Sequence, residues 1–174
     1  WGPGSKPLSE AEESVLQRRR DGQAAGGGYA HIQGTKPQTL AYGLNDSPAG
    51  LAAWIVEKYR TWSDCGGDVE KRFTKDELLT TITIYWVTQT IGSSTKIYYE
   101  TLRKPWNMAK GERIEVPCAI AAFPAEISVP SRELAERSYN VQQWTVMPAG
   151  GHFAALEEPD RLVEDIRSFF RPLR

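Results

Sequence analysis

The sequence predicts an α/β protein in which a helical region, residues 1–110, precedes a strand–helix–strand–helix unit, residues 111–174. Two observations support this prediction. Apolar side chains recur at helical spacing in the first region, for example over residues 51–59. The pattern changes at about residue 111, where the apolar run from Ile114 to Phe123 suits a buried strand. A strand, a helix and a second strand in succession imply a right-handed crossover between parallel strands.

Capping signals mark two helices of the first region. The segments Ser9-Glu10-Ala11-Glu12 and Thr74-Lys75-Asp76-Glu77 each place a glutamate three residues after a hydroxyl side chain, which is the pattern of a capping box. They predict one helix from Ser9 to about Arg20 and another from Thr74 to about Thr90. Before the first of them, the Gly/Pro-rich residues 1–7 are expected to form a loop.

The rest of the first region contains weaker signals. Ser47 suits an N-cap and Pro48 the first helical position, so a third helix is expected to begin there. A short fourth helix is predicted around residues 96–100, after a break at Gly92-Ser93-Ser94. Residues 22–28 are expected to be a flexible linker, and residues 29–44 a compact loop region.

The second region should contain strands at residues 114–123 and 143–147, with a helix over residues 131–137 and another starting at Pro159. Two parallel strands are too few for a stable sheet, because such strands are normally buried within larger sheets. The chain also begins with Trp1 rather than Met. Both points lead us to expect a C-terminal portion of a longer protein.

Composition excludes several classes of function. Lys and Arg number 21 against 22 Asp and Glu, a net charge of −1, which argues against nucleic acid or an anionic membrane as partner. Cys65 and Cys118 form no metal-binding motif, so neither a metal nor a cofactor is expected. We find no signal peptide and no apolar run near the roughly 18 residues of a membrane span, and expect a cytoplasmic, soluble protein.

A histidine and a glutamate follow the two predicted strands. His152 lies on a Gly-Gly turn after the strand at residues 143–147, and Glu126 follows the strand at residues 114–123. A parallel crossover brings both strand ends to one edge of the sheet. A carboxylate bonded to one imidazole nitrogen fixes the tautomer of a general base. The alternative is that Glu126 is a surface acid and His152 a loop histidine.

Three segments resemble the microsomal-type epoxide hydrolases: YAHIQGTKPQT at Tyr29–Thr39, LNDSPAGLAAW at Leu44–Trp54 and GGHFAALEEP at Gly150–Pro159. The resemblance extends over nearly the whole chain from about residue 8. It implies an α/β-hydrolase fold, with residues 1–110 as a helical lid and residues 111–174 as the C-terminal part of the core.

The resemblance also implies a mechanism and site residues. In this family an aspartate opens the epoxide to an alkyl-enzyme ester, two lid tyrosines protonate the epoxide oxygen, and a histidine activates water to release a vicinal diol. His152 matches the base and Glu126 its acid partner, while Tyr98 and Tyr29 match the tyrosines. Tyr99 is the alternative to Tyr98. The implied substrates are water and a small epoxide, and the aromatic-rich lid suggests an apolar or aryl one.

The family's nucleophilic aspartate and its oxyanion loop have no counterpart among these residues. We therefore expect the nucleophile on a missing N-terminal core segment, and no activity from this chain alone. Two other functions remain open: a catalytically inactive module that binds a small molecule or a partner, and a related esterase or dehalogenase. The tyrosine pair argues against the second, because those reactions develop no alkoxide. A homodimer is compatible with the sequence.

Overall fold

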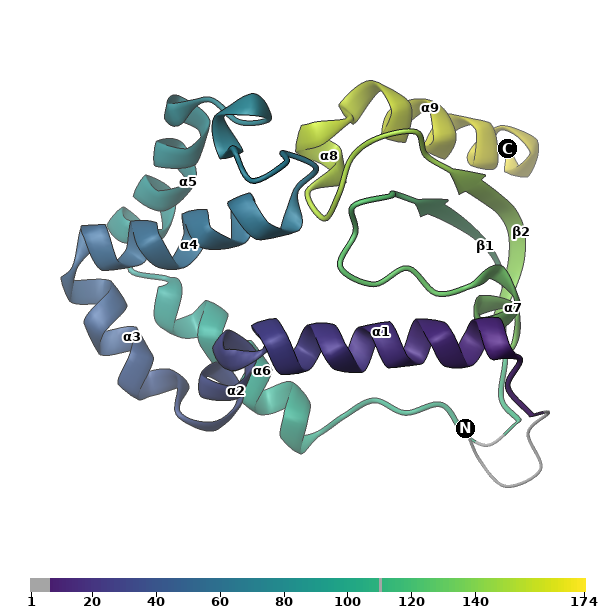
Figure 1. The fold of residues 1–174 in the computed structure, drawn as a ribbon, viewed down its shortest axis with the longest axis horizontal. Helices are drawn as coiled ribbons and strands as arrows, with labels where there is room; N and C mark the ends of the chain where they lie inside the picture. The colour runs from purple at the N-terminus through teal and green to yellow at the C-terminus, as the bar shows by residue number, and fades with distance from the viewer. Residues whose placement is uncertain (1–6, 110) are drawn as a thin grey trace. The chain divides into compact units, whose positions relative to one another are not determined.

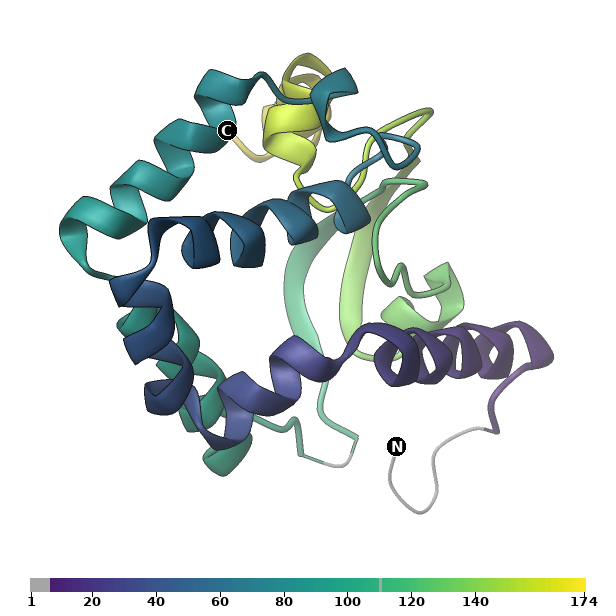
Figure 2. The same cartoon turned by 60° about the vertical axis from the view of Figure 1, so that its left-hand side comes forward.

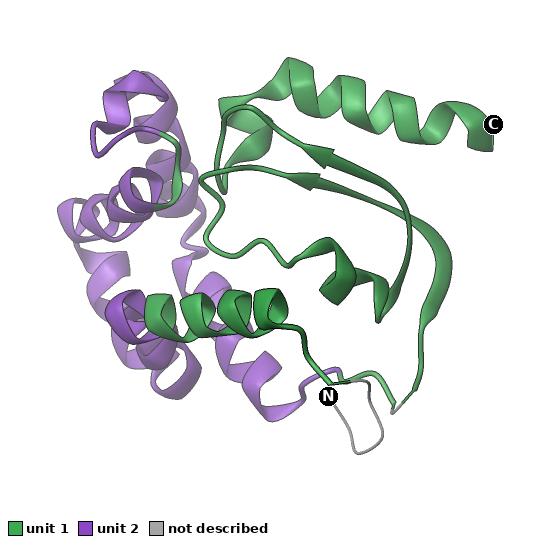
Figure 3. Cartoon of the chain, turned by 45° about the vertical axis from the view of Figure 1, so that its right-hand side comes forward, with its two compact units in different colours: residues 1–23, 62–64, 107–174 green, residues 24–61, 65–106 purple. Residues whose placement is uncertain are grey.

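The computed structural model describes residues 7–109 and 111–174 (Figure 1), so Trp1 and most of the predicted loop at residues 1–7 lie outside them. The chain divides into two compact units (Figure 3). Unit 1 contains the residues up to Gln23, Trp62–Asp64 and everything from Asn107 on, and unit 2 contains Ala24–Thr61 and Cys65–Trp106. The lid and core boundary at residue 110 stays a prediction.

Unit 1 is built on two parallel strands, as the sequence predicts. Strand β1, Ile114–Ala122, pairs with β2, Tyr139–Val146, and the pairing runs up to the partners Ala122 and Val146 at the strand ends (Figure 1). Helix α7, Arg132–Glu136, makes the crossover, and the Ser131 hydroxyl accepts a hydrogen bond from Leu134 N at its start. After β2 the chain forms α8, Ala154–Glu157, which was not predicted.

Helix α9, Pro159–Phe170, begins at the predicted proline and is followed by the short η2, Arg171–Leu173. Asp165 joins this helix to β2, because its carboxylate accepts hydrogen bonds from the side chains of Gln143 and Thr145. This contact holds α9 against the second strand, close to the point where the chain leaves the sheet.

Helix α1, Glu10–Gly26, starts with the predicted capping box, in which Ser9 N donates to Glu12 Oε2 at 2.7 Å and Glu12 N to Ser9 Oγ at 3.3 Å. It continues past Arg20 through residues predicted to be a linker. Glycine within a helix costs only about 1 kcal/mol relative to alanine, and the neighbouring Gln23, Ala24 and Ala25 are good helix formers. The linker prediction was therefore wrong.

All the secondary-structure elements described in unit 2 are helices. Residues 29–44, predicted to be a loop, form most of α2, Gly28–Thr35, and α3, Pro37–Asp46. Pro37 opens α3 because a proline at the first turn has no amide hydrogen to lose from the helix. Pro37 thus marks the boundary between two helices, whereas Gly34 and Gly43 lie inside them, and the loop prediction was wrong.

Three longer helices complete unit 2: α4, Pro48–Trp62; α5, Lys75–Thr88; and α6, Ile91–Arg103. The short η1, Val69–Lys71, lies between α4 and α5. The Ser47 cap and the Thr74 capping box are confirmed. Helix α6 starts earlier than predicted, since Gln89 adopts a left-handed conformation that ends α5 and Ile91 is already buried in the core.

The core of unit 2 joins α3, α4, α5 and α6. Its buried members are Leu44, Leu51, Ile82 and Ile91. Burying a side chain of this size contributes about 1.5–3 kcal/mol. The core therefore fixes the four helices to one another. None of the helices in the described part of the chain is long and apolar enough to cross a membrane.

A buried ion pair links α1 to the crossover. Glu12 is 1% exposed, and its Oε1 and Oε2 accept from Arg137 Nε at 2.6 Å and Nη2 at 2.7 Å. The Arg137 hydrogen bond, more than any other contact, lowers the pKa of Glu12 to about 2. Arg137 also donates to the carbonyl of Pro7. The sequence marks Glu12 only as part of a cap, so this pair was not predicted.

The Glu12→Gln substitution should lower the thermal unfolding temperature at pH 7, because it leaves the Arg137 guanidinium without its buried carboxylate. The pKa of Glu12 is lower in the folded than in the unfolded chain, so its stabilisation is full above pH 4.5 and is lost as pH falls towards 2. When unfolding temperatures are measured by calorimetry at a series of pH values, the difference between Glu12→Gln and the unchanged protein should shrink as the pH falls from 4.5 towards 2. Glu13→Gln, an exposed neighbour, should behave like the unchanged protein, and equal effects would contradict the assignment.

Candidate functional site

His152 and Glu126 meet beyond the ends of the two strands. Imidazole Nδ1 lies 2.9 Å from Glu126 Oε1 and 3.2 Å from Oε2. The His152 side chain is 41% exposed and the Glu126 side chain 29% exposed, so the pair is reachable from solvent. When Nδ1 carries the hydrogen and donates to the carboxylate, Nε2 is left as a proton acceptor. This arrangement can remove a proton from water.

A tight glycine turn presents the histidine. Gly150 has a φ of +101°, which residues with a Cβ resist, and its carbonyl accepts from Ala125 N at 3.0 Å. A Cβ on Gly151 would lie 2.6 Å from the carbonyl oxygen of Trp62. Both glycines are therefore required, the first by its backbone conformation and the second by the close approach of Trp62.

Trp62 contacts His152 twice, and neither contact was predicted from the sequence. The Trp62 carbonyl accepts from His152 N at 2.9 Å. The indole lies edge-to-face against the imidazole, with ring centroids 5.1 Å apart, and Phe153 packs on the imidazole at 5.3 Å. The imidazole is thus flanked by two aromatic rings. No local pattern could reveal this contact, because Trp62 ends a helix far away in sequence.

Tyr29 and Tyr98 form a second pair, within unit 2. Tyr29 lies on α2 and Tyr98 on α6, and their rings meet edge-to-face at 5.9 Å. Burial raises the pKa of Tyr29 above 10, and the charge and hydrogen bond of Tyr98 raise it further. The Lys58 ammonium lies 4.5 Å from the Tyr29 ring centroid. The Tyr29 phenol therefore stays protonated at neutral pH.

Close packing of α2 and α6 brings the two phenols together (Figures 1 and 2). A Cβ on Gly34 would lie 2.3 Å from a methyl carbon of Leu102, so glycine permits the approach. Arg103 adds a hydrogen bond to the Gly34 carbonyl at 3.4 Å. The segment that contains Tyr29 and the helix that contains Tyr98 are thereby held in register.

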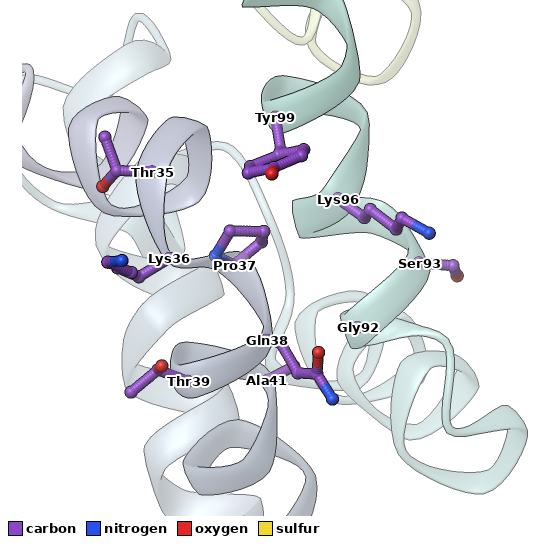
Figure 4. A pocket seen from close by; sticks show the side chains of 10 residues that line it. All are labelled: Thr35, Lys36, Pro37, Gln38, Thr39, Ala41, Gly92, Ser93, Lys96 and Tyr99. Carbon is purple, nitrogen blue, oxygen red and sulfur yellow. The ribbon is translucent and has the colours of Figure 1, made fainter.

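Tyr99 has different neighbours from Tyr98. The Arg103 guanidinium lies 3.2 Å from the Tyr99 ring centroid. Tyr99 also lines a cavity of about 680 Å³ between the α2–α3 junction and α6 (Figure 4). Tyr29 and Tyr98 are not among the residues that line this cavity. Of the two adjacent tyrosines, the structure pairs Tyr98 with Tyr29.

The structure thus brings the four predicted site residues together as two pairs, one in each unit. Over residues 7–109 and 111–174, no three His, Cys, Asp or Glu side chains gather closely enough to hold a metal ion. Cys65 and Cys118 are free thiols. The chemistry that the pairs can supply is therefore proton donation from phenols and proton removal by an imidazole.

Comparison with curated proteins finds relatives of one kind, although no protein-family model matches the chain. The chain is 44% identical to epoxide hydrolase 1 of Sus scrofa over 151 residues, which cover 82% of this chain and 33% of that protein. It is 43% identical to juvenile hormone epoxide hydrolase 2 of Ctenocephalides felis over 171 residues, 93% of this chain and 35% of that protein. The chain therefore spans about a third of the length of these curated relatives.

Solved structures agree with the sequence comparison. The epoxide hydrolase of Aspergillus niger superposes with a TM-score of 0.78 at 28% identity, covering 99% of this chain and 43% of that one. The juvenile hormone epoxide hydrolase of the silkworm Bombyx mori gives a TM-score of 0.79 at 27% identity, covering 96% of this chain and 43% of that one. The chain is thus homologous to epoxide hydrolases over most of its length, and it has an α/β-hydrolase fold.

Proposed function

We propose that the polypeptide containing these residues hydrolyses a small-molecule epoxide to a vicinal diol through an alkyl-enzyme ester. The observation that carries this proposal is the Tyr29–Tyr98 pair. Two adjacent phenols suit an oxygen that becomes an alkoxide as a ring opens. Ester hydrolysis instead develops charge on a carbonyl oxygen and dehalogenation on a halide, and neither of these atoms has to take up a proton from a phenol as it develops charge.

In the first step, an aspartate carboxylate supplied by the remainder of the polypeptide attacks an epoxide carbon. The bond between that carbon and the ring oxygen breaks as the new carbon–oxygen bond forms. Tyr29 and Tyr98 donate hydrogen bonds to the leaving oxygen, and one phenol gives it a proton. The raised pKa of Tyr29 favours the protonated form that this role requires.

In the second step, water hydrolyses the ester. Nε2 of His152 takes one proton from water, and the resulting hydroxide adds to the ester carbonyl. The Glu126 carboxylate, 2.9 Å from Nδ1, stabilises the imidazolium that forms. Collapse of the adduct expels the second oxygen as an alkoxide, which takes the proton from the imidazolium and completes the diol. The aspartic acid left behind loses its proton, and the phenolate formed in the first step regains one, so both groups are restored.

The substrate is proposed to be an apolar or aryl epoxide, and residues 1–110 are proposed to form the lid. The aromatic content of that region supports this class, because apolar and aromatic side chains usually line small-molecule sites. Several relatives are named for juvenile hormone, which is a further candidate class of substrate. Styrene oxide is a suitable first probe, since it is small, apolar and aromatic.

Tyr98→Phe should slow ring opening by about 10²–10³-fold, because it removes one of two donors to the developing alkoxide. The measurement is the single-turnover rate of ester formation when the polypeptide containing these residues is mixed with styrene oxide. Tyr99→Phe is the matched control, and it should leave that rate close to the original value. If Tyr99→Phe were the slower variant, the assignment of Tyr98 would be wrong.

His152→Gln should slow hydrolysis of the ester by at least about 10²-fold while leaving ring opening nearly intact, because a general base acts only in the second step. The variant should then accumulate a covalent adduct, seen in the intact mass as the addition of one styrene oxide. His31→Gln, at the other histidine of the chain, should show no accumulation. Undiminished turnover by His152→Gln would exclude the proposed base.

A further inference from the structure

A buried glutamate lies next to the turn that presents His152. Glu157 is the last residue of α8 and is 8% exposed. Its Oε1 accepts a hydrogen bond from Phe153 N at 3.0 Å, and its Oε2 accepts from Asp64 N at 2.7 Å. One carboxylate therefore joins the residue after the histidine to a segment far away in sequence.

Asp64 returns a hydrogen bond to the same turn. Its Oδ2 accepts from Gly150 N at 3.0 Å. Together with the bond from His152 N to the Trp62 carbonyl, three contacts now hold segment Trp62–Asp64 against the turn. The contacts involve the backbone of Gly150 and His152 directly, and that of Phe153 through Glu157.

The hydrogen bonds of Glu157 and Asp64 indicate that these residues position the turn that contains His152. A carboxylate is expensive to bury unless its oxygens are paired, and here both oxygens of Glu157 accept from backbone amides. The network ends at Trp62, whose indole packs edge-to-face on the imidazole. Moving this segment would remove the wall that keeps Nδ1 of His152 facing Glu126.

We propose that Glu157 and Asp64 are positioning residues for His152. They keep segment Trp62–Asp64 in place, and this segment holds the imidazole so that Nδ1 donates to Glu126 and Nε2 remains free to accept a proton. The inference rests on the proposed function for its kinetic consequence only. The orientation and tautomer of the imidazole can be measured without any turnover.

The decisive variant is Glu157→Gln, because an amide has one acceptor oxygen where the carboxylate has two, and it sets an NH₂ group against a backbone amide donor. The chain has only two histidines, so imidazole nitrogen signals from an isotope-labelled sample are few, and His31 serves as an internal reference. In the unchanged protein, His152 should show the tautomer protonated at Nδ1. In Glu157→Gln it should shift towards a mixture, with His31 unmoved.

The kinetic arm uses the same single-turnover assay with styrene oxide. Glu157→Gln should slow ester hydrolysis by about 10- to 10²-fold, since a small misplacement of a catalytic group has an effect of this order. Ring opening should be unchanged. If styrene oxide and other epoxides are not turned over at all, the proposed function fails while the nitrogen spectra still test the positioning.

Three further variants separate positioning from stability. Asp165→Ala removes a carboxylate that accepts hydrogen bonds from Gln143 and Thr145 in the same unit, away from the turn. It should lower the unfolding temperature without changing the His152 signals. If Glu157→Gln does not fold, the pair Asp64→Ala and Asp64→Asn replaces it, because only the second retains an acceptor for Gly150 N. Unchanged His152 signals in Glu157→Gln, or in Asp64→Ala, would overturn the proposal.

Discussion

The parallel pairing of β1 with β2 is the constraint on which the His152–Glu126 pair depends. Parallel strands place their C-terminal ends at one edge of a sheet, so the residues that follow Ala122 and Val146 emerge together. The crossover through α7 is what a parallel connection needs, and its ion pair with α1 anchors it. An antiparallel pairing would place the glutamate and the histidine at opposite ends.

Strand pairing alone does not orient the imidazole. The turn at Gly150 and Gly151 leaves backbone amides that need acceptors, and buried amides without acceptors are costly. Segment Trp62–Asp64 and Glu157 supply those acceptors. The same contacts bring an indole against the imidazole, so one arrangement both supplies acceptors for the backbone amides and orients the imidazole.

The tyrosine pair depends on a different constraint, which is how closely two helices can approach. Gly34 lets α2 and α6 come near enough for Tyr29 and Tyr98 to touch. The same closeness partly buries Tyr29 and raises the pKa of its phenol. Helix packing thus determines the position of the two phenols.

The sequence by itself determined the elements with strong local signals. The capping boxes at Ser9 and Thr74, the apolar β1 and the proline that begins α9 all act within a few residues, so their outcomes follow from local chemistry. It also predicted His152, Glu126, Tyr98 and Tyr29 as site residues, largely through segments that resemble a family, and the structure brings them together as two pairs. Residues 29–44 were misread as a loop, because glycine and proline signal a break without saying which elements flank it.

Only the tertiary structure decided the partners of these residues. Trp62 packing on His152, Glu157 bridging to Asp64, and Glu12 pairing with Arg137 each join positions far apart in the chain. Hydrogen bonds and ring contacts act over a few ångströms, and a sequence without its fold contains no information on which distant residues come that close. The residue types therefore indicated the chemistry from the sequence alone, and packing decided how those residues are arranged.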